Sequence, residues 1–181
     1  MNHFNIKAII KQEEIHSVIS LYRHTHAKEQ CDEIQAELLQ HFHYEGFLAL
    51  KVMDANDQLI GFIYGYTSKP GQDDHEQYKT TLNKDLYDQW LHHCFVITGI
   101  VIHPTIRRKK IVRYLIEHIT NVVRHKTAIL TLELSNKKDR NLYKQLGWDL
   151  ICDHYYPTSI IKPFVIMGKQ LQSTPQLTSQ A

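Results

Sequence analysis

The first part of the chain combines one short apolar run with two helical stripes. The run from Phe4 to Ile10 predicts a strand. Apolar side chains then recur at the i, i+3, i+4 and i+7 spacing of one helix face at Ile15, Val18, Ile19 and Tyr22. Asp32 is a candidate N-cap for a second helix, whose buried side comprises Ile34, Leu38 and Phe42.

The next segment has the pattern of a β-hairpin. Strand-like residues from Phe47 to Asp54 and from Leu59 to Tyr66 flank a polar turn at residues 55–58. The stretch from Ser68 to Lys84 is polar and contains Pro70-Gly71, so it is expected to be the longest loop. A short helix is predicted from Asp85 to His92.

The centre of the chain carries the strongest hydrophobic pattern. Residues 95–102 (FVITGIVI) are apolar at both odd and even positions, which predicts a central strand buried on both faces. An amphipathic helix follows and extends to Arg124. Its apolar stripe comprises Ile111, Leu115, Ile119 and Val122, and its outward face comprises Arg113, Glu117, Asn121 and Arg124.

The C-terminal part predicts a strand, a short helix and two further strands. The strand spans Ile129 to Leu134, and the helix from Asp139 to Leu146 ends at Gly147, the expected left-handed position. Strands are predicted at 148–155 and 164–171, and the polar tail at 172–181 is expected to be disordered. Together these elements predict one α/β domain over residues 1–171, with a mixed sheet flanked by helices.

Composition narrows the class of protein. Lys plus Arg number 21 and Asp plus Glu number 19, giving a net charge of +2, which argues against binding to nucleic acid or an anionic membrane. The three cysteines lie far apart in sequence, so reduced thiols and a cytoplasmic location are expected rather than a disulfide framework or zinc site. The 13 histidines are spread along the chain, which favours composition over a metal site or pH sensor. Neither a signal peptide nor a transmembrane helix is predicted.

Chemistry is concentrated where the central strand ends. His103-Pro104 closes the strand, and Arg107-Arg108-Lys109-Lys110 opens the following helix. A helix N-terminus presents free N–H groups and partial positive charge, so four adjacent cations would make it an anion site suited to a pyrophosphate. The alternative is a solvated charge run before an ordinary amphipathic helix.

This stretch resembles the acetyl-CoA signature of the Gcn5-related N-acetyltransferase (GNAT) superfamily, Q/R-x-x-G-x-G/A. The six positions here are Arg107, Arg108, Lys109, Lys110, Ile111 and Val112. Arg107 matches, whereas Lys110 and Val112 replace the two small residues that let the family's backbone approach the phosphates. If these residues are already helical, Lys110 can point outward and add a phosphate contact.

A second motif strengthens the resemblance. The family often shows N-x-x-A-x-x-L-Y-x-x-L-G-F, and this chain matches it at Asn136, Leu142, Tyr143, Leu146 and Gly147, with Asp139 and Trp148 in place of Ala and Phe. The resemblance therefore covers about residues 94–148, the expected cofactor-binding core. It implies a GNAT-like fold with a central mixed, mostly antiparallel sheet.

The resemblance implies transfer of an acetyl group from acetyl-CoA, as cosubstrate and without a metal, to a primary amine. Residues 107–112 would bind the pyrophosphate, and the backbones of Ile100 and Ile102 would bind the pantetheine arm. Asn136 would contact the cofactor or a bound water; alternatively it only caps the short helix. Tyr143 would donate a proton to the CoA thiolate; alternatively it only packs in that helix.

The general base and the acceptor are less defined. The family's usual strand Glu is replaced at about Thr98, so a water relay, His103 or a neutral amine remain alternatives. Gly99 lies where the family strand commonly bulges, although it could equally relieve a side-chain clash. A small-molecule amine is favoured as acceptor, and a homodimer is one option for the assembly. The competing hypothesis is a catalytically inactive CoA-ester sensor or interaction module of the same fold.

Overall fold

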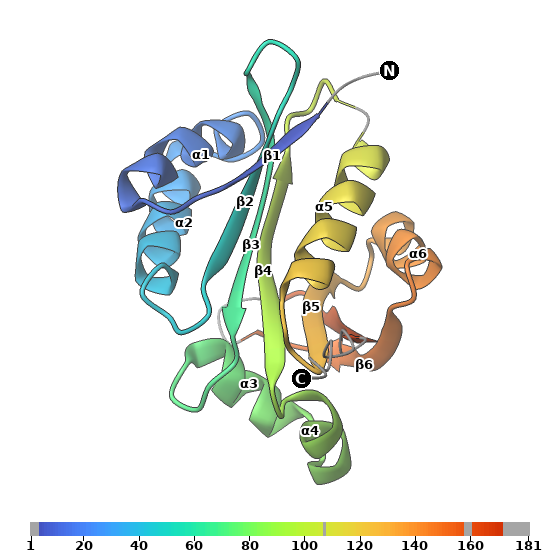
Figure 1. The fold of residues 1–181 in the computed structure, drawn as a ribbon. Helices are drawn as coiled ribbons and strands as arrows, with labels where there is room; N and C mark the ends of the chain where they lie inside the picture. Colours follow the sequence, from blue (N-terminus) through green and yellow to red (C-terminus); the bar gives the residue numbers. More distant parts are fainter. Residues whose placement is uncertain (1–3, 107, 158–160, 172–181) are drawn as a thin grey trace, which may run out of the picture.

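A seven-stranded sheet organises the chain in this computed structural model, which describes residues 4–106, 108–157 and 161–171 (Figure 1). The strands are β1 (Asn5–Ala8), β2 (Leu48–Met53), β3 (Leu59–Thr67), β4 (Cys94–Ile102), β5 (Thr127–Glu133), β6 (Asp149–Tyr155) and β7 (Phe164–Gln170). Their order is β1-β2-β3-β4-β5-β7-β6, and only β4 and β5 pair in parallel. The predicted mixed, mostly antiparallel sheet is confirmed.

Helices cover both faces of the sheet (Figure 1). They are the 3₁₀ turn η1 (Gln12–Glu14), α1 (Ile15–Tyr22), α2 (Lys28–His41), α3 (Asp73–Thr81), α4 (Lys84–Trp90), α5 (Arg108–Val122) and α6 (Lys137–Gln145). Helices α1 and α2 lie on one face and α5 on the other, while α3 and α4 lie where β3 ends and β4 begins. None of the helices in the described part of the chain is long and apolar enough to cross a bilayer.

Alternating side chains of the central strands supply the two cores. On β3, Phe62 and Tyr64 pack with α1 and α2, whereas Ile63 packs with the core on the α5 side. On β4, Val101 joins the first core and Ile102 the second. This period-two alternation is what a strand sandwiched between helical layers requires.

Three sequence predictions about helices were wrong. The expected loop at 68–84 contains α3, whose exposed face is polar and which buries little apart from His75 and Tyr78, so it left no apolar stripe to detect. Asp32 lies inside α2, which begins four residues earlier, where the Gln30 side chain accepts a hydrogen bond from the Ala27 N–H at 3.1 Å. Val122 is 51% exposed because α5 ends there.

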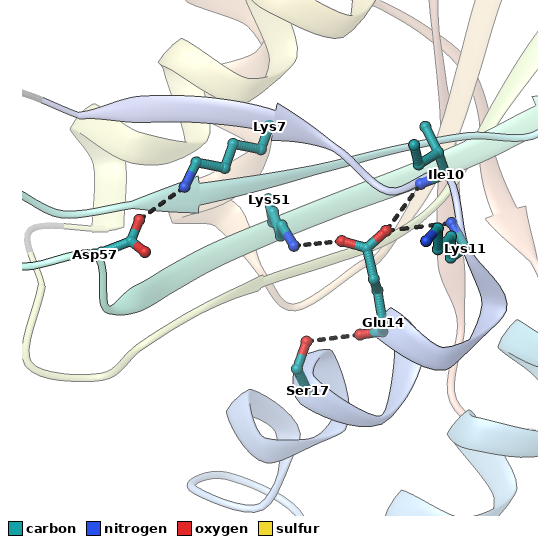
Figure 2. Close-up of polar contacts among 7 residues, drawn as sticks. All are labelled: Lys7, Ile10, Lys11, Glu14, Ser17, Lys51 and Asp57. Carbon is teal, nitrogen blue, oxygen red and sulfur yellow. Dashed lines mark hydrogen bonds and ion pairs between the residues drawn. The ribbon is translucent and has the colours of Figure 1, made fainter.

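A carboxylate network ties α1 to the edge of the sheet (Figure 2). Glu14 accepts hydrogen bonds from the N–H groups of Ile10 and Lys11, at 3.1 and 3.2 Å, which satisfies donors exposed where β1 gives way to η1. Its other oxygen pairs with Lys51 Nζ of β2 at 2.5 Å. The hydrogen bond from Lys51, with those from the two backbone N–H groups, lowers the pKa of the Glu14 carboxyl despite its partial desolvation.

Replacing Glu14 with Ala should lower the free energy of unfolding by about 2 kcal/mol, since hydrogen bonds to a charged group are lost. A lowered pKa means that the ionised carboxylate stabilises the folded state. This contribution is complete above the unfolded carboxyl pKa of about 4.3 and is lost as the pH falls through the lower folded value. Denaturant unfolding of wild type and variant at neutral and acidic pH measures the difference.

The neighbouring Glu13→Ala provides the control, because Glu13 is exposed and makes no side-chain hydrogen bond or ion pair within the described residues. Its effect should stay within about 0.5 kcal/mol. Equal stabilities of the Glu14→Ala and Glu13→Ala proteins at neutral pH would contradict the assigned role of this network.

Candidate active site

The central parallel pair of strands separates halfway along its length. Pairing between β4 and β5 runs from Cys94↔Thr127 to Ile97↔Leu130 and then stops. Beyond this point lies a cavity of about 180 Å³. It is lined by Ile97, Thr98, Gly99, Ile100, Leu130, Thr131, Leu132, Asp139 and Tyr143.

A bulge in β4 marks the point of separation. Gly99 pairs with Tyr64 and Ile97 with Gly65, so Thr98 is the extra residue without a partner on β3. The expected irregularity near Gly99 is therefore present. The bulge also reduces the burial of the strand: Thr98 is exposed and Gly99 and Ile100 are half-buried. The prediction of a strand buried on both faces was therefore wrong at residues 98–100, whereas Val101 and Ile102 are buried as expected.

Gly99 has a steric reason to lack a side chain. A Cβ at this position would overlap the Tyr64 ring and lie 3.1 Å from the Tyr22 hydroxyl oxygen. Glycine thus allows two aromatic side chains from α1 and β3 to close over the strand. The two explanations that the sequence offered for Gly99, a bulge in the strand and relief of a side-chain clash, therefore both hold.

The backbone beyond the bulge is directed toward the cavity. The His103 N–H donates to the Ile60 carbonyl at 2.9 Å, so His103 faces β3. Backbone groups point to the same side at alternate residues of an antiparallel strand, which places those of Ile100 and Ile102 on the side of β5. That side has no strand partner beyond Ile97. The geometry suits main-chain hydrogen bonds to an extended ligand.

A second and larger cavity opens on the opposite side of β4. Its volume is about 420 Å³, and α1, α2, β3 and β4 enclose it. The lining residues are Tyr22, Thr25, His26, Ile34, Glu37, Tyr64, Thr98, Gly99, Ile100, Val101 and Ile102. Thr98, Gly99 and Ile100 line both cavities, so the two border the same bulge from its two sides.

Tyr143 lies at the first cavity, as the proton-donor hypothesis requires. It is 4% exposed on α6 and lines the cavity beside Asp139. Its ring also meets Trp148 edge-on, with centroids 5.8 Å apart, and its carbonyl accepts from the Trp148 N–H at 3.0 Å. Tyr143 therefore packs in the core and faces the cavity at the same time.

The predicted phosphate site lies at the start of α5, which follows the end of β4 (Figure 1). Arg107 falls outside the described residues, as does the side chain of Arg108. Lys109 and Lys110 are exposed, and Lys110 is the third helical residue. Ile111 and Val112 are buried in the core, so only their backbone is available for a ligand.

Two other predicted residues lie outside both cavity linings. Asn136 caps α6: its side-chain oxygen accepts from the Asp139 N–H at 3.1 Å, and its amide donates to the Asp139 carboxylate at 3.0 Å. This is the structural alternative that the sequence left open. His103 contacts the Thr105 hydroxyl at 2.8 Å and stacks edge-on against His24. Its position does not favour a role as general base.

The sequence missed the functional character of the larger cavity. Tyr22 and Tyr64 are buried and had appeared only as apolar positions, while Glu37 of α2 had no role assigned. Burial raises the pKa of the Glu37 carboxyl, and the negative charges of Asp74 and Glu33 raise it further. Burial also raises the pKa of Tyr22, with a smaller contribution from Glu37. No sequence motif marks these residues because they come from three separate elements, α1, α2 and β3.

Solved structures with the same architecture are N-acetyltransferases. The spermidine/spermine N-acetyltransferase of Vibrio cholerae, in complex with manganese ions, is 16% identical, covering 93% of this chain and 92% of that chain, with a TM-score of 0.60. The ribosomal-protein-S18-alanine N-acetyltransferase of Escherichia coli is 14% identical, covering 97% and 98%, with a TM-score of 0.64. A comparison with curated proteins gave no significant match. Among the residues described here, no cluster of three His, Cys, Asp or Glu side chains could hold a metal.

The family follows from the sequence match. Residues 15–148 match the model of the acetyltransferase (GNAT) family, which spans both helical layers and the central strands. The chain therefore belongs to the GNAT family, and its fold agrees with that of the N-acetyltransferase structures.

Proposed function

We propose that this protein transfers an acetyl group from acetyl-CoA to a primary amine of a small molecule. The observation that supports this proposal most is that two cavities border the β4 bulge and share Thr98, Gly99 and Ile100 in their linings. A thioester reaching the bulge from the β5 side and an amine reaching it from the α1–α2 side would meet at Thr98–Ile100. Such convergence is the positioning that acyl transfer between two substrates needs.

Four features of the chain fit acetyl-CoA. The cavity beside β5 is narrow, and the unpaired edge of β4 can hydrogen-bond an extended arm through Ile100 and Ile102. The N-terminus of α5 offers backbone N–H groups to phosphates. Exposed Lys109 and Lys110 add positive charge at this helix end. The ammonium group of Lys110 would then attract the phosphates and compensate for the small residue that the family has at this position.

In the proposed reaction, the neutral amine nitrogen attacks the thioester carbonyl carbon, and the carbon–sulfur bond breaks. Tyr143 gives its hydroxyl proton to the departing sulfur, a role open to a phenol that stays protonated at neutral pH. The amine nitrogen loses one proton to solvent and the Tyr143 phenolate regains one from solvent, so the products are an N-acetyl amide and CoA thiol. The structure offers no strand carboxylate at Thr98 to take the proton, which leaves a water relay in the larger cavity as the favoured route.

The size of the acceptor cavity supports a small molecule. Its volume of about 420 Å³ falls in the range typical of small-ligand sites. The two similar structures are a spermidine/spermine N-acetyltransferase and a ribosomal-protein-S18-alanine N-acetyltransferase. The lining of the cavity by α1 and α2 favours the first kind of acceptor for this chain.

The proposal is tested by incubating the protein with acetyl-CoA and a panel of small amines while following release of CoA thiol. We expect release that depends on both protein and amine. We also expect acetyl-CoA to raise the melting temperature, corresponding to about 2.7 kcal/mol at a hundredfold excess over Kd. Thermal stabilisation without release would support the sensor hypothesis, and the absence of both would contradict a CoA-dependent role.

A further inference from the structure

The larger cavity carries an unbalanced negative charge. Glu37 lines it and has no ion pair or hydrogen-bonded partner within the described part of the chain. The nearest charges that act on it, Asp74 and Glu33, are also negative. No Lys or Arg lines this cavity among the described residues. Glu37 is an exposed residue, so its carboxylate is open to a ligand in the cavity, and a carboxylate without a positive partner favours a cationic one.

A second observation points to a ligand in the same place. Tyr22 is 7% exposed, lines the cavity, and its hydroxyl has no hydrogen-bond partner among the described residues. A residue that is mostly buried but keeps an unpartnered hydroxyl in a cavity lining offers that hydroxyl to a ligand donor. This hydroxyl lies near Gly99, because a Cβ built at Gly99 would be 3.1 Å from its oxygen. The negative charge of Glu37 contributes to the raised pKa of the same hydroxyl.

The walls between these polar groups suit a cation on an alkyl chain. Tyr64 contributes a buried ring whose hydroxyl contacts His41 Nδ1 at 3.2 Å, so the ring is held in place. Aromatic faces attract ammonium groups, and a carboxylate binds them by charge-assisted hydrogen bonds. Ile34 and Val101 give the cavity apolar lining between the polar groups.

The geometry points to an acceptor with two amino groups. We propose that one nitrogen reaches the β4 bulge and is acetylated, while a second, cationic nitrogen is bound by Glu37 and the Tyr22 hydroxyl. Glu37 would then determine specificity without taking part in bond formation. This inference rests on the proposed acetyl transfer, because the bulge is taken as the reacting end of the cavity.

The test compares diaminoalkanes with monoaminoalkanes of the same chain length, using kcat/KM at saturating acetyl-CoA. Wild type should prefer the diamine at the chain length that spans the cavity. Glu37→Gln should reduce that preference by about tenfold, mainly through KM, since a charge-assisted contact is replaced by a neutral one. Tyr22→Phe should reduce it in the same direction.

Glu33→Gln is the matched control, because Glu33 lies one turn earlier on α2 and is exposed like Glu37, but it does not line the cavity. It should retain the wild-type preference. The inference is overturned if wild type shows no preference for any diamine, if Glu37→Gln retains the preference, or if Glu33→Gln loses it equally.

Amine binding, measured by calorimetry in the presence of CoA, separates this inference from the proposed function. Tighter binding of diamines that depends on Glu37 would support the acceptor class even if no amine were acetylated. Acetylation of amines with no difference in Kd between diamine and monoamine would leave the proposed function intact and overturn the inference.

Discussion

Replacing Tyr143 with Phe is expected to lower kcat by about a hundredfold or more, the usual loss when a general acid is removed. The substitution keeps the ring, its edge-on contact with Trp148 and its burial, and removes only the hydroxyl of a residue that lines the cavity beside β5. Acetyl-CoA affinity should therefore change little. Steady-state kinetics and thermal-shift titration with acetyl-CoA measure the two effects separately.

Tyr155→Phe is the matched control for loss of a buried hydroxyl. Tyr155 is 2% exposed and donates to the Gln77 side chain at 2.7 Å, but it lines neither cavity. Its loss should lower stability and leave kcat close to that of wild type. A stable Tyr143→Phe protein with wild-type turnover would remove the proton-donor role and leave Tyr143 as a packing residue. An unfolded variant would show instead that its hydroxyl is structurally bonded.

Replacing Gly99 with Ala should reduce kcat/KM by about a hundredfold, because small displacements of positioning groups cost that much in rate. The new methyl group would overlap the Tyr64 ring and force it away from the bulge. Since Gly99 lines both cavities, the change falls at the junction where the two substrates would meet.

Gly61→Ala controls for loss of stability through crowding. A Cβ at Gly61 would lie 3.0 Å from Ile102 Cδ1 and 3.1 Å from Ile111 Cγ2, in the core on the α5 side. We expect Gly61→Ala to lower the melting temperature with a much smaller loss of kcat/KM for the folded protein. Full activity of a folded Gly99→Ala protein would contradict the role assigned to the bulge.

Much of the fold could be predicted because its hydrophobic patterns are strong. The α1 stripe of Ile15, Val18, Ile19 and Tyr22 is buried as expected, and Gly147 adopts the left-handed conformation with φ of +79° that ends α6. Helix α3 could not be predicted, since a helix that buries little besides His75 and Tyr78 has no apolar stripe. Its stability comes from tertiary packing against Tyr155 and its neighbours.

The candidate site divides in a similar way. The side of the site near β5 was predictable because its residues follow one another along β4, α5 and α6 and carry recognisable spacing. The acceptor side was not, because Tyr22, Glu37 and Tyr64 are brought together only when α1 and α2 fold onto the sheet. Tyr22 also satisfies a helical stripe, so its periodicity could not reveal that its hydroxyl faces a cavity.

The most direct test of the central claim is to follow an isotope-labelled acetyl group from acetyl-CoA during incubation with the protein and a small amine. The account predicts that mass spectrometry will detect the label as an N-acetyl amide of that amine, with an equal amount of free CoA thiol. It also predicts that the Tyr143→Phe protein forms about a hundredfold less of both products in the same time. Thiol release without a labelled amide, or no reaction with any amine while acetyl-CoA remains bound, would contradict it.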